Sequence, residues 1–105
     1  MNVEFLAPAR VEFAEAVRHY ETQRPGLGDE FAGEVQRTID RILQYPEAWS
    51  LLSMRTRRCP TNRFPYGIIY QVRYQVRGDT LLIIAVMHLH RAPLSWRSRL
   101  PRRDQ

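Results

Sequence analysis

The stretch Tyr66–Leu89 reads YGIIYQVRYQVRGDTLLIIAVMHL and holds two apolar runs on either side of Gly78-Asp79. The first run alternates polar and apolar residues, and Gly-Asp suits a two-residue turn, so the stretch predicts a β-hairpin with strands 66–77 and 80–89. A two-residue turn also fixes which residues pair across the hairpin: Arg73 with Ile84, Ile69 with His88, and Gly67 with His90.

This register predicts one nearly apolar sheet face and one mixed face. The apolar face gathers Tyr66, Ile68, Tyr70, Val72, Tyr74, Val76, Leu81, Ile83, Ala85, Met87 and Leu89. The mixed face gathers Gly67, Ile69, Gln71, Arg73, Gln75, Arg77, Leu82, Ile84, Val86, His88 and His90. We expect helices to cover the apolar face, because a two-layer domain buries its apolar sides against each other. The mixed face is then partly open and is a candidate binding surface.

The residues before the hairpin predict those helices. Asn2–Leu6 has the alternation of a short strand, and Pro8 follows it at a position that suits a first helical turn. Apolar residues recur at three- and four-residue steps from Ala9 to Arg24-Pro25-Gly26, and again from Leu27 to Tyr45-Pro46. Two helices joined by so short a turn form an antiparallel hairpin.

The whole chain is predicted to be one α+β domain over residues 1–105. Its order is strand, helix, helix and three strands, the first of the three over Met54–Cys59 and the other two forming the hairpin, in an antiparallel-dominated sheet with the helical hairpin on one face. The length of 105 residues suits a single core that buries about two thirds of the unfolded surface. Residues 92–105 form a basic C-terminal segment with one helical turn near Ser95–Arg99, and we expect its last residues to be frayed.

Charge is divided unevenly along the chain. Residues 1–50 hold five arginines and nine acids, a net charge of −4, whereas residues 51–105 hold eleven arginines and two acids, a net charge of +9. A strongly basic half predicts an acidic partner, either a nucleic acid or an acidic protein segment.

Composition excludes several other classes of protein. No apolar run is long enough to span a bilayer, and the first ten residues do not resemble a signal peptide, so we expect a soluble cytoplasmic protein with no membrane partner. The single cysteine, Cys59, can form no internal disulfide. His88 and His90 share one side of a strand, but Cys59 is the one further ligand at hand, so we predict no metal site and no cofactor.

Several ordered segments resemble the toxins of the RelE/ParE superfamily. The segments in the second half are Arg63–Tyr70 (RFPYGIIY), Ile84–His88 (IAVMH) and Arg91–Pro93 (RAP), followed by Trp96 and Arg99. The segments in the first half are Ala14–Tyr20, the turn Gly26-Leu27-Gly28 with Phe31, and Ile42–Pro46. The resemblance implies a RelE-like fold and a heteromeric type II toxin–antitoxin complex, in which an antitoxin with an acidic C-terminal segment silences the toxin.

Two activities compete within this superfamily. RelE-like toxins are ribosome-dependent endoribonucleases that cut messenger RNA, whereas ParE-like toxins, associated with plasmid stabilisation, poison DNA gyrase. RelE-like nucleases carry an arginine three residues before the tyrosine of the third strand, and this chain has Gly67 there. The tyrosine that they place near the C-terminus is also missing. The resemblance therefore favours a ParE-like gyrase inhibitor with no catalytic residues. A nuclease, or an antitoxin-binding member without toxicity, remains an alternative.

The candidate site residues follow from these alternatives. If the chain is a nuclease, the catalytic set is His90, Arg63, Arg73 and Arg91, with His90 first because the predicted register places it opposite Gly67. For binding an antitoxin or a target, the candidates are Arg55, Arg57, Arg63, Arg73, His88, His90, Arg91, Trp96, Arg97 and Arg99. Trp96 could instead cover an edge of the core, and the tyrosines of the first hairpin strand are expected in the core.

Overall fold

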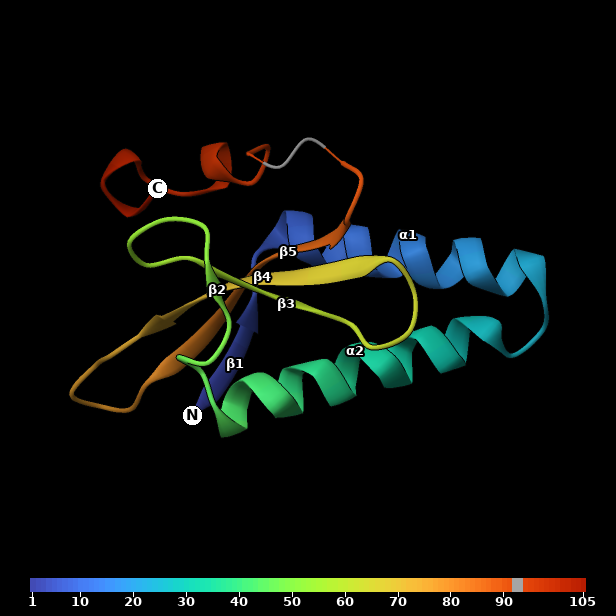
Figure 1. The fold of residues 1–105 in the computed structure, drawn as a ribbon, viewed down its shortest axis with the longest axis horizontal. Helices are drawn as coiled ribbons and strands as arrows, with labels where there is room; N and C mark the ends of the chain where they lie inside the picture. The colour runs from blue at the N-terminus through green and yellow to red at the C-terminus, as the bar shows by residue number, and fades with distance from the viewer. Residues whose placement is uncertain (92–93) are drawn as a thin grey trace.

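One mixed sheet of five strands forms the centre of the computed structural model, which describes residues 1–91 and 94–105 (Figure 1). Its strands are β1 (Asn2–Phe5), β2 (Ser50–Leu51), β3 (Arg57–Pro60), β4 (Tyr66–Arg73) and β5 (Thr80–His88). They lie in the order β1-β5-β4-β3-β2, with β1 parallel to β5 and the other neighbours antiparallel. The predicted fold class is confirmed. The predicted strand 54–59 is wrong at its start, because residues 52–56 form a turn and β3 begins at Arg57.

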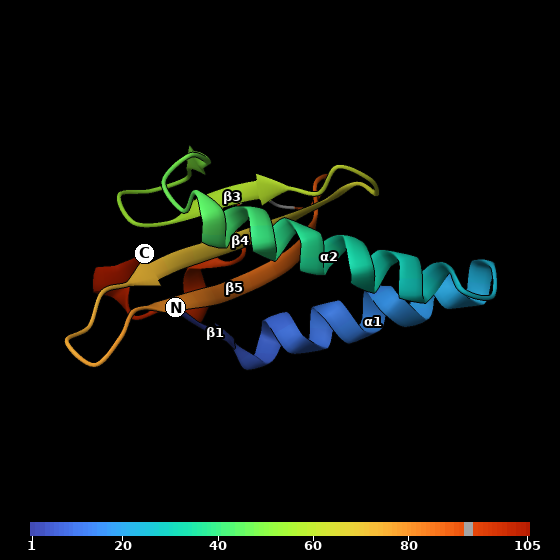
Figure 2. The same cartoon turned by 90° about the horizontal axis from the view of Figure 1, so that it is seen from below.

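A helical hairpin packs on one face of this sheet (Figure 2). It consists of α1 (Ala7–Gln23) and α2 (Leu27–Gln44), and both helices match their predicted ranges closely. Gly26 adopts a left-handed φ of 89° between them, and the Glu21 carboxylate accepts hydrogen bonds from the N–H groups of Gly26 and Gly28 at the start of α2. Within the described residues, neither helix is long and apolar enough to cross a membrane.

The β4–β5 hairpin has a longer connection than the sequence predicts. Residues 74–79 form the loop, and the Asp79 carboxylate accepts a hydrogen bond from the N–H of Gln75 at 3.1 Å. The predicted two-residue turn and its register are therefore wrong. The observed pairs, which replace the predicted ones, are Arg73 with Thr80, Ile69 with Ala85, Gly67 with Met87, and Tyr66 with His88.

A one-residue register shift then exchanges the two faces of β5. It falls between Ile69 and Tyr70 and leaves Ile84 as the extra residue of a β-bulge. Beyond the bulge, Val86 packs with the helical core, whereas Ala85 and Met87 face the other side, the reverse of the prediction. Tyr66, Ile68, Tyr70 and Val72 lie on the helical side as predicted, but Tyr74 and Val76 belong to the loop and are exposed.

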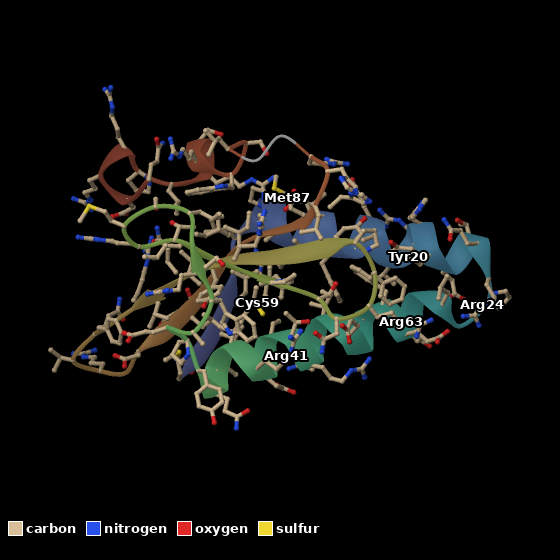
Figure 3. All side chains as sticks on the ribbon, in the orientation of Figure 1. Tyr20, Arg24, Arg41, Cys59, Arg63 and Met87 are labelled. Atoms are coloured by element: carbon tan, nitrogen blue, oxygen red, sulfur yellow. The ribbon has the colours of Figure 1, made fainter. Side chains whose placement is uncertain are left out.

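The C-terminal segment, residues 94–105, covers the sheet face that we expected to be open (Figure 1). Its 3-10 turns η1 (Arg97–Arg99) and η2 (Arg102–Asp104) place Trp96 and Leu100 against the sheet, and Trp96 is fully buried. Figure 3 labels Met87 on this side of the sheet and Cys59 on the helical side. The sheet residues under the segment are Ile69, Leu82, Ile84, Ala85 and Met87. The expectation of an open face is wrong, because apolar contacts and a hydrogen bond at Asp104 hold the segment against the sheet, whereas fraying of the last residues stays a prediction.

The Glu12–Arg99 ion pair fixes this segment to the rest of the chain. Arg99 donates to both carboxylate oxygens of Glu12, at 2.6 and 2.8 Å, and to the Ile84 carbonyl at 3.0 Å. Glu12 also accepts the N–H of Val86 at 3.1 Å. Because β1 pairs with β5 only as far as Ile83, these two side chains satisfy backbone groups on the β5 edge that β1 does not reach.

Candidate functional site

The arginines and histidines chosen from the sequence fall into separate regions of the surface. The first region is a groove of about 700 Å³, here called the arginine groove. It is lined by Pro46, Glu47, Met54, Arg55, Arg57, Tyr70, Gln71, Val72, Arg73, Tyr74, Gln75, Arg103 and Asp104. The predicted candidates Arg55, Arg57 and Arg73 therefore lie together, and Arg103 joins them from the C-terminal segment.

Asp104 lies at the centre of the charges in the arginine groove. Its carboxylate is 3.6 Å from Arg55 Nη1 and 3.8 Å from Arg73 Nη2, and its main-chain carbonyl accepts a hydrogen bond of 2.7 Å from Gln71 Nε2. Arg57 is held differently, since its Nη1 donates to the carbonyl of Trp49 at 2.7 Å. The groove thus binds a carboxylate and a peptide carbonyl of its own chain.

Two tyrosines line the groove in different ways. Tyr70 is fully buried, as predicted, and its hydroxyl donates to the Pro46 carbonyl at 2.6 Å. Burial raises the pKa of Tyr70, although the nearby Arg57 opposes the rise. Tyr74 is 65 % exposed, so the prediction of a core position for it is wrong. Its ring adds apolar surface to a basic groove.

The second region is a cleft of about 440 Å³ beside α1, here called the histidine cleft. Its lining is Glu12, Glu15, Ala16, His19, Tyr66, Val86, Met87, His88, His90 and Arg91. The rings of His88 and His90 lie 5.2 Å apart, and Nδ1 of His88 accepts the backbone N–H of His90 at 3.1 Å. Burial raises the pKa of Tyr66. The positive charge of Arg91 opposes this rise, and the negative charge of Glu12 adds to it.

All three histidines of the chain line the histidine cleft. Sequence reasoning missed His19, because it lies on α1 and only the packing of α1 against β5 brings it to the end of that strand. Among the described residues, no three histidine, cysteine, aspartate or glutamate side chains are placed to hold a metal ion.

The surroundings of Gly67 differ from the prediction. Met87, not His90, pairs with Gly67, so the reason for ranking His90 first is removed. A Cβ at Gly67 would lie 3.1 Å from the Arg58 side chain and 3.2 Å from that of Leu89. The stem of Arg58 therefore occupies the space next to this glycine, a contact that the sequence pattern does not predict.

The third region is the loop that carries Arg63. Figure 3 shows Arg63 beside α2, near Tyr20. Its guanidinium donates to Glu30 at 2.9 Å and lies 4.9 Å from the centre of the Phe64 ring, and its backbone N–H donates to the buried carboxylate of Glu34 at 2.8 Å. Phe64 has a positive φ of 74°, an uncommon conformation for an aromatic residue. Glu34 thus holds a strained loop on α2.

Trp96 and Arg99 hold the C-terminal segment on the rest of the chain. Trp96 is fully buried against the second sheet face, and Arg99 is paired with Glu12. Arg97 contacts Trp96 within the segment, with its guanidinium 5.7 Å from the centre of that ring. Ala92 and Pro93 of the RAP motif lie outside the described residues.

The four residues of the nuclease alternative do not form one site. His90 and Arg91 lie in the histidine cleft, Arg73 lies in the arginine groove, and Arg63 pairs with Glu30 on α2. Tyr66 pairs with His88 while Arg73 pairs with Thr80, so Arg73 and the histidines are at opposite ends of β4. At roughly 3.3 Å per residue, the length of β4 separates them by about 23 Å.

The chain is similar to known toxins over most of its length. A family model described as the ParE toxin of the type II toxin–antitoxin system, parDE, matches residues 3–93. Among solved structures, the chromosomal ParDE toxin–antitoxin system from P. aeruginosa contains a similar chain, with a TM-score of 0.70 and 13% identity, covering 86% of this chain and 97% of that chain. At this identity the similarity concerns the fold alone. No curated protein matches.

Proposed function

The chain belongs to the ParE toxin family of type II toxin–antitoxin systems, and from this premise we propose that it inhibits DNA gyrase when free and is silenced by a cognate antitoxin. The match covers residues 3–93, and so includes both helices, the strands β2 to β5 and all of β1 except its first residue. Gyrase acts in the cytoplasm, which is where we place the protein. The proposal assigns it no catalytic residues and no cofactor.

The wide separation of the four nuclease candidates is the observation that favours gyrase, and not messenger RNA, as the target. Cleavage of RNA needs a base, an acid and a cation within hydrogen-bond reach of one phosphate. In this fold Arg73 is about a strand's length from His90, and Arg63 is paired with Glu30. An inhibitor that acts by binding an enzyme needs no such cluster of catalytic groups, and basic residues spread over a surface are compatible with this mode of action.

An acidic antitoxin suits the charge of the molecule. The half of the chain after residue 50 has a net charge of +9, and ten of its arginines lie outside the Glu12–Arg99 pair. Opposite charges across an interface speed association and exclude wrong partners. We therefore propose a heteromeric complex in which an acidic segment of the antitoxin contacts the basic half.

A ribosome-dependent nuclease is the second candidate, and the histidine cleft favours it. His19, His88, His90 and Arg91 line it together with Tyr66, which places imidazoles, the commonest general acids and bases, next to a cation. In this alternative the arginine groove takes no part in the chemistry. A family member without toxicity would bind the antitoxin and show neither activity.

The test compares the purified, antitoxin-free chain in two reactions: DNA supercoiling by gyrase and cleavage of ribosome-bound messenger RNA. Each is repeated with His90→Ala, and with Arg24→Ala as a matched surface control. We expect inhibited supercoiling with all three proteins and intact RNA. RNA that is cut by the parent chain and spared by His90→Ala would overturn the gyrase proposal. Absence of both activities would identify a member without toxicity.

A further inference from the structure

We propose that the arginine groove binds an acidic peptide segment of a partner protein, and that the chain's own Asp104 occupies the carboxylate position until the partner arrives. The groove belongs to neither the histidine cleft nor the Arg63 loop. Identification of the partner as the antitoxin rests on the proposed function, but the peptide-binding property itself does not.

Asp104 is held in the groove by contacts that a competitor could replace. Its two ion pairs, at 3.6 and 3.8 Å, are longer than hydrogen bonds. Arg55 is 70 % exposed and Arg73 is 42 % exposed, so solvent weakens both pairs. A carboxylate that approached either guanidinium in the planar, two-bonded geometry would bind it better than Asp104 does.

The groove also carries more positive charge than its own acids neutralise. Four arginines line it (Arg55, Arg57, Arg73 and Arg103) against two acids (Glu47 and Asp104), an excess of two positive charges. An acidic segment would offset this excess, and arginine suits the task because its five donors lie in one plane.

The present occupant indicates that the ligand is a peptide and not a nucleic acid. Gln71 donates to the main-chain carbonyl of Asp104 at 2.7 Å while the arginines contact the carboxylate of the same residue. The groove therefore already contacts both the backbone and the side chain of an acidic residue. Nucleic acids also offer oxygen acceptors to Gln71, but their anions are phosphates, so the carboxylate held in the groove favours an acidic peptide.

Exposed apolar side chains extend the groove and suit a peptide with hydrophobic residues beside its acids. Met54 is 95 % exposed and Tyr74 is 65 % exposed, and both line the groove. Large exposed apolar side chains next to a charged groove are typical of an interaction site.

The experiment measures binding of a fluorescein-labelled peptide of alternating glutamate and leucine by fluorescence anisotropy. The same peptide with glutamine in place of glutamate, and a single-stranded DNA of equal charge, serve as competing ligands. The proteins are the parent chain, Asp104→Asn, the double variant Arg55→Gln/Arg73→Gln, and the control Arg24→Gln/Arg37→Gln, which removes two exposed arginines from the helical hairpin. A urea unfolding curve for each protein confirms that it is folded.

We expect Asp104→Asn to bind the glutamate peptide about threefold to tenfold more tightly than the parent, because the internal competitor loses its charge. The groove double variant should bind at least about tenfold more weakly, and the hairpin control should stay within about twofold. Equal affinity of all four proteins, or tighter binding of the DNA than of the peptide, would overturn the proposal. The gyrase assay contains no peptide, so failure of gyrase inhibition and failure of peptide binding are separate results.

Discussion

At the scale of single residues, Glu12 and Arg99 connect α1, the β5 edge and the C-terminal segment. We predict that Arg99→Ala lowers the free energy of unfolding by about 2 kcal/mol, because the largely buried Glu12 carboxylate loses the charge of Arg99 and keeps the N–H of Val86. Urea unfolding followed by circular dichroism measures the change. Arg24→Ala removes an arginine from an exposed ion pair with Glu30 and should cost less than about 0.5 kcal/mol. Equal losses in the free energy of unfolding for the two variants would contradict the connecting role of the Glu12–Arg99 pair.

Glu34 gives the molecule a dependence on pH. Burial raises its pKa, but hydrogen bonds from the N–H groups of Arg63 and Asn62, together with the hydrogen bond and charge of Arg37, outweigh burial, and the pKa of Glu34 lies below its ordinary value of 4.5. A lowered folded-state pKa stabilises the fold above the unfolded-state pKa, and the contribution is lost as the pH falls through the folded-state pKa.

Glu34→Gln tests this dependence. We predict that the variant is less stable than the parent at about pH 6, and that the difference shrinks below about pH 4.5 as the parent carboxylate becomes protonated. Urea unfolding at several pH values measures it. Glu30→Gln is the control, since Glu30 pairs with Arg24 and Arg63 on the exposed surface and its loss should matter little at any pH. A difference for Glu34→Gln that stays constant with pH would refute the explanation.

At the scale of elements, the close approach of α1 and α2 depends on one glycine. A Cβ at Gly28 would lie 2.7 Å from the backbone carbonyl oxygen of Val17, which cannot move without shifting α1. We predict that Gly28→Ala destabilises the fold by about 1–3 kcal/mol. Gly33 in the same helix is the matched control. Its Cβ would meet only the flexible end of Arg37, at 3.3 Å, so Gly33→Ala should be neutral or stabilising by up to about 1 kcal/mol. Thermal unfolding compares them, and the opposite order would be inconsistent with this packing.

The sequence predicts the positions of the helices and strands better than it predicts which side of the sheet each side chain occupies. Pro8, Gly26 and Pro46 mark the helix ends locally, and both helices match the prediction. The hairpin register depends instead on Asp79, whose carboxylate stabilises a six-residue loop, and on the bulge at Ile84. A bulge leaves no local signal when every neighbour is apolar, and one extra residue reverses the faces of the strand beyond it.

The regions that make up the candidate site were only partly predictable for a similar reason. Arg57 and Arg73 lie on the adjacent strands β3 and β4, and Arg55 lies in the turn before β3, so strand pairing gave a basis for grouping them. Each of the two surfaces also contains residues from a distant part of the chain: Arg103 and Asp104 in the arginine groove, and His19 in the histidine cleft. Patterns in the sequence do not predict such long-range contacts. The contacts of Trp96 and Leu100 with the second sheet face are also long-range contacts that sequence patterns do not predict.

At the scale of the whole molecule, the fold separates its two candidate surfaces, the arginine groove and the histidine cleft. Figure 1 shows the joined ends of α1 and α2 at one end and the loop between β4 and β5 at the other. The arginine groove lies at the β4 end next to that loop, and the histidine cleft lies at the opposite end of β4. The two linings share no residue, so substitutions in one surface can be tested without altering the other.

The most direct test of the gyrase proposal is the formation of DNA double-strand breaks. Purified gyrase and supercoiled plasmid are incubated with the antitoxin-free chain, the reaction is stopped with detergent and protease, and linear DNA is quantified. The proposal predicts linear DNA that increases with the amount of the chain and requires gyrase. Plasmid that stays supercoiled at every ratio of chain to gyrase, under conditions in which a known gyrase poison gives breaks, would contradict it.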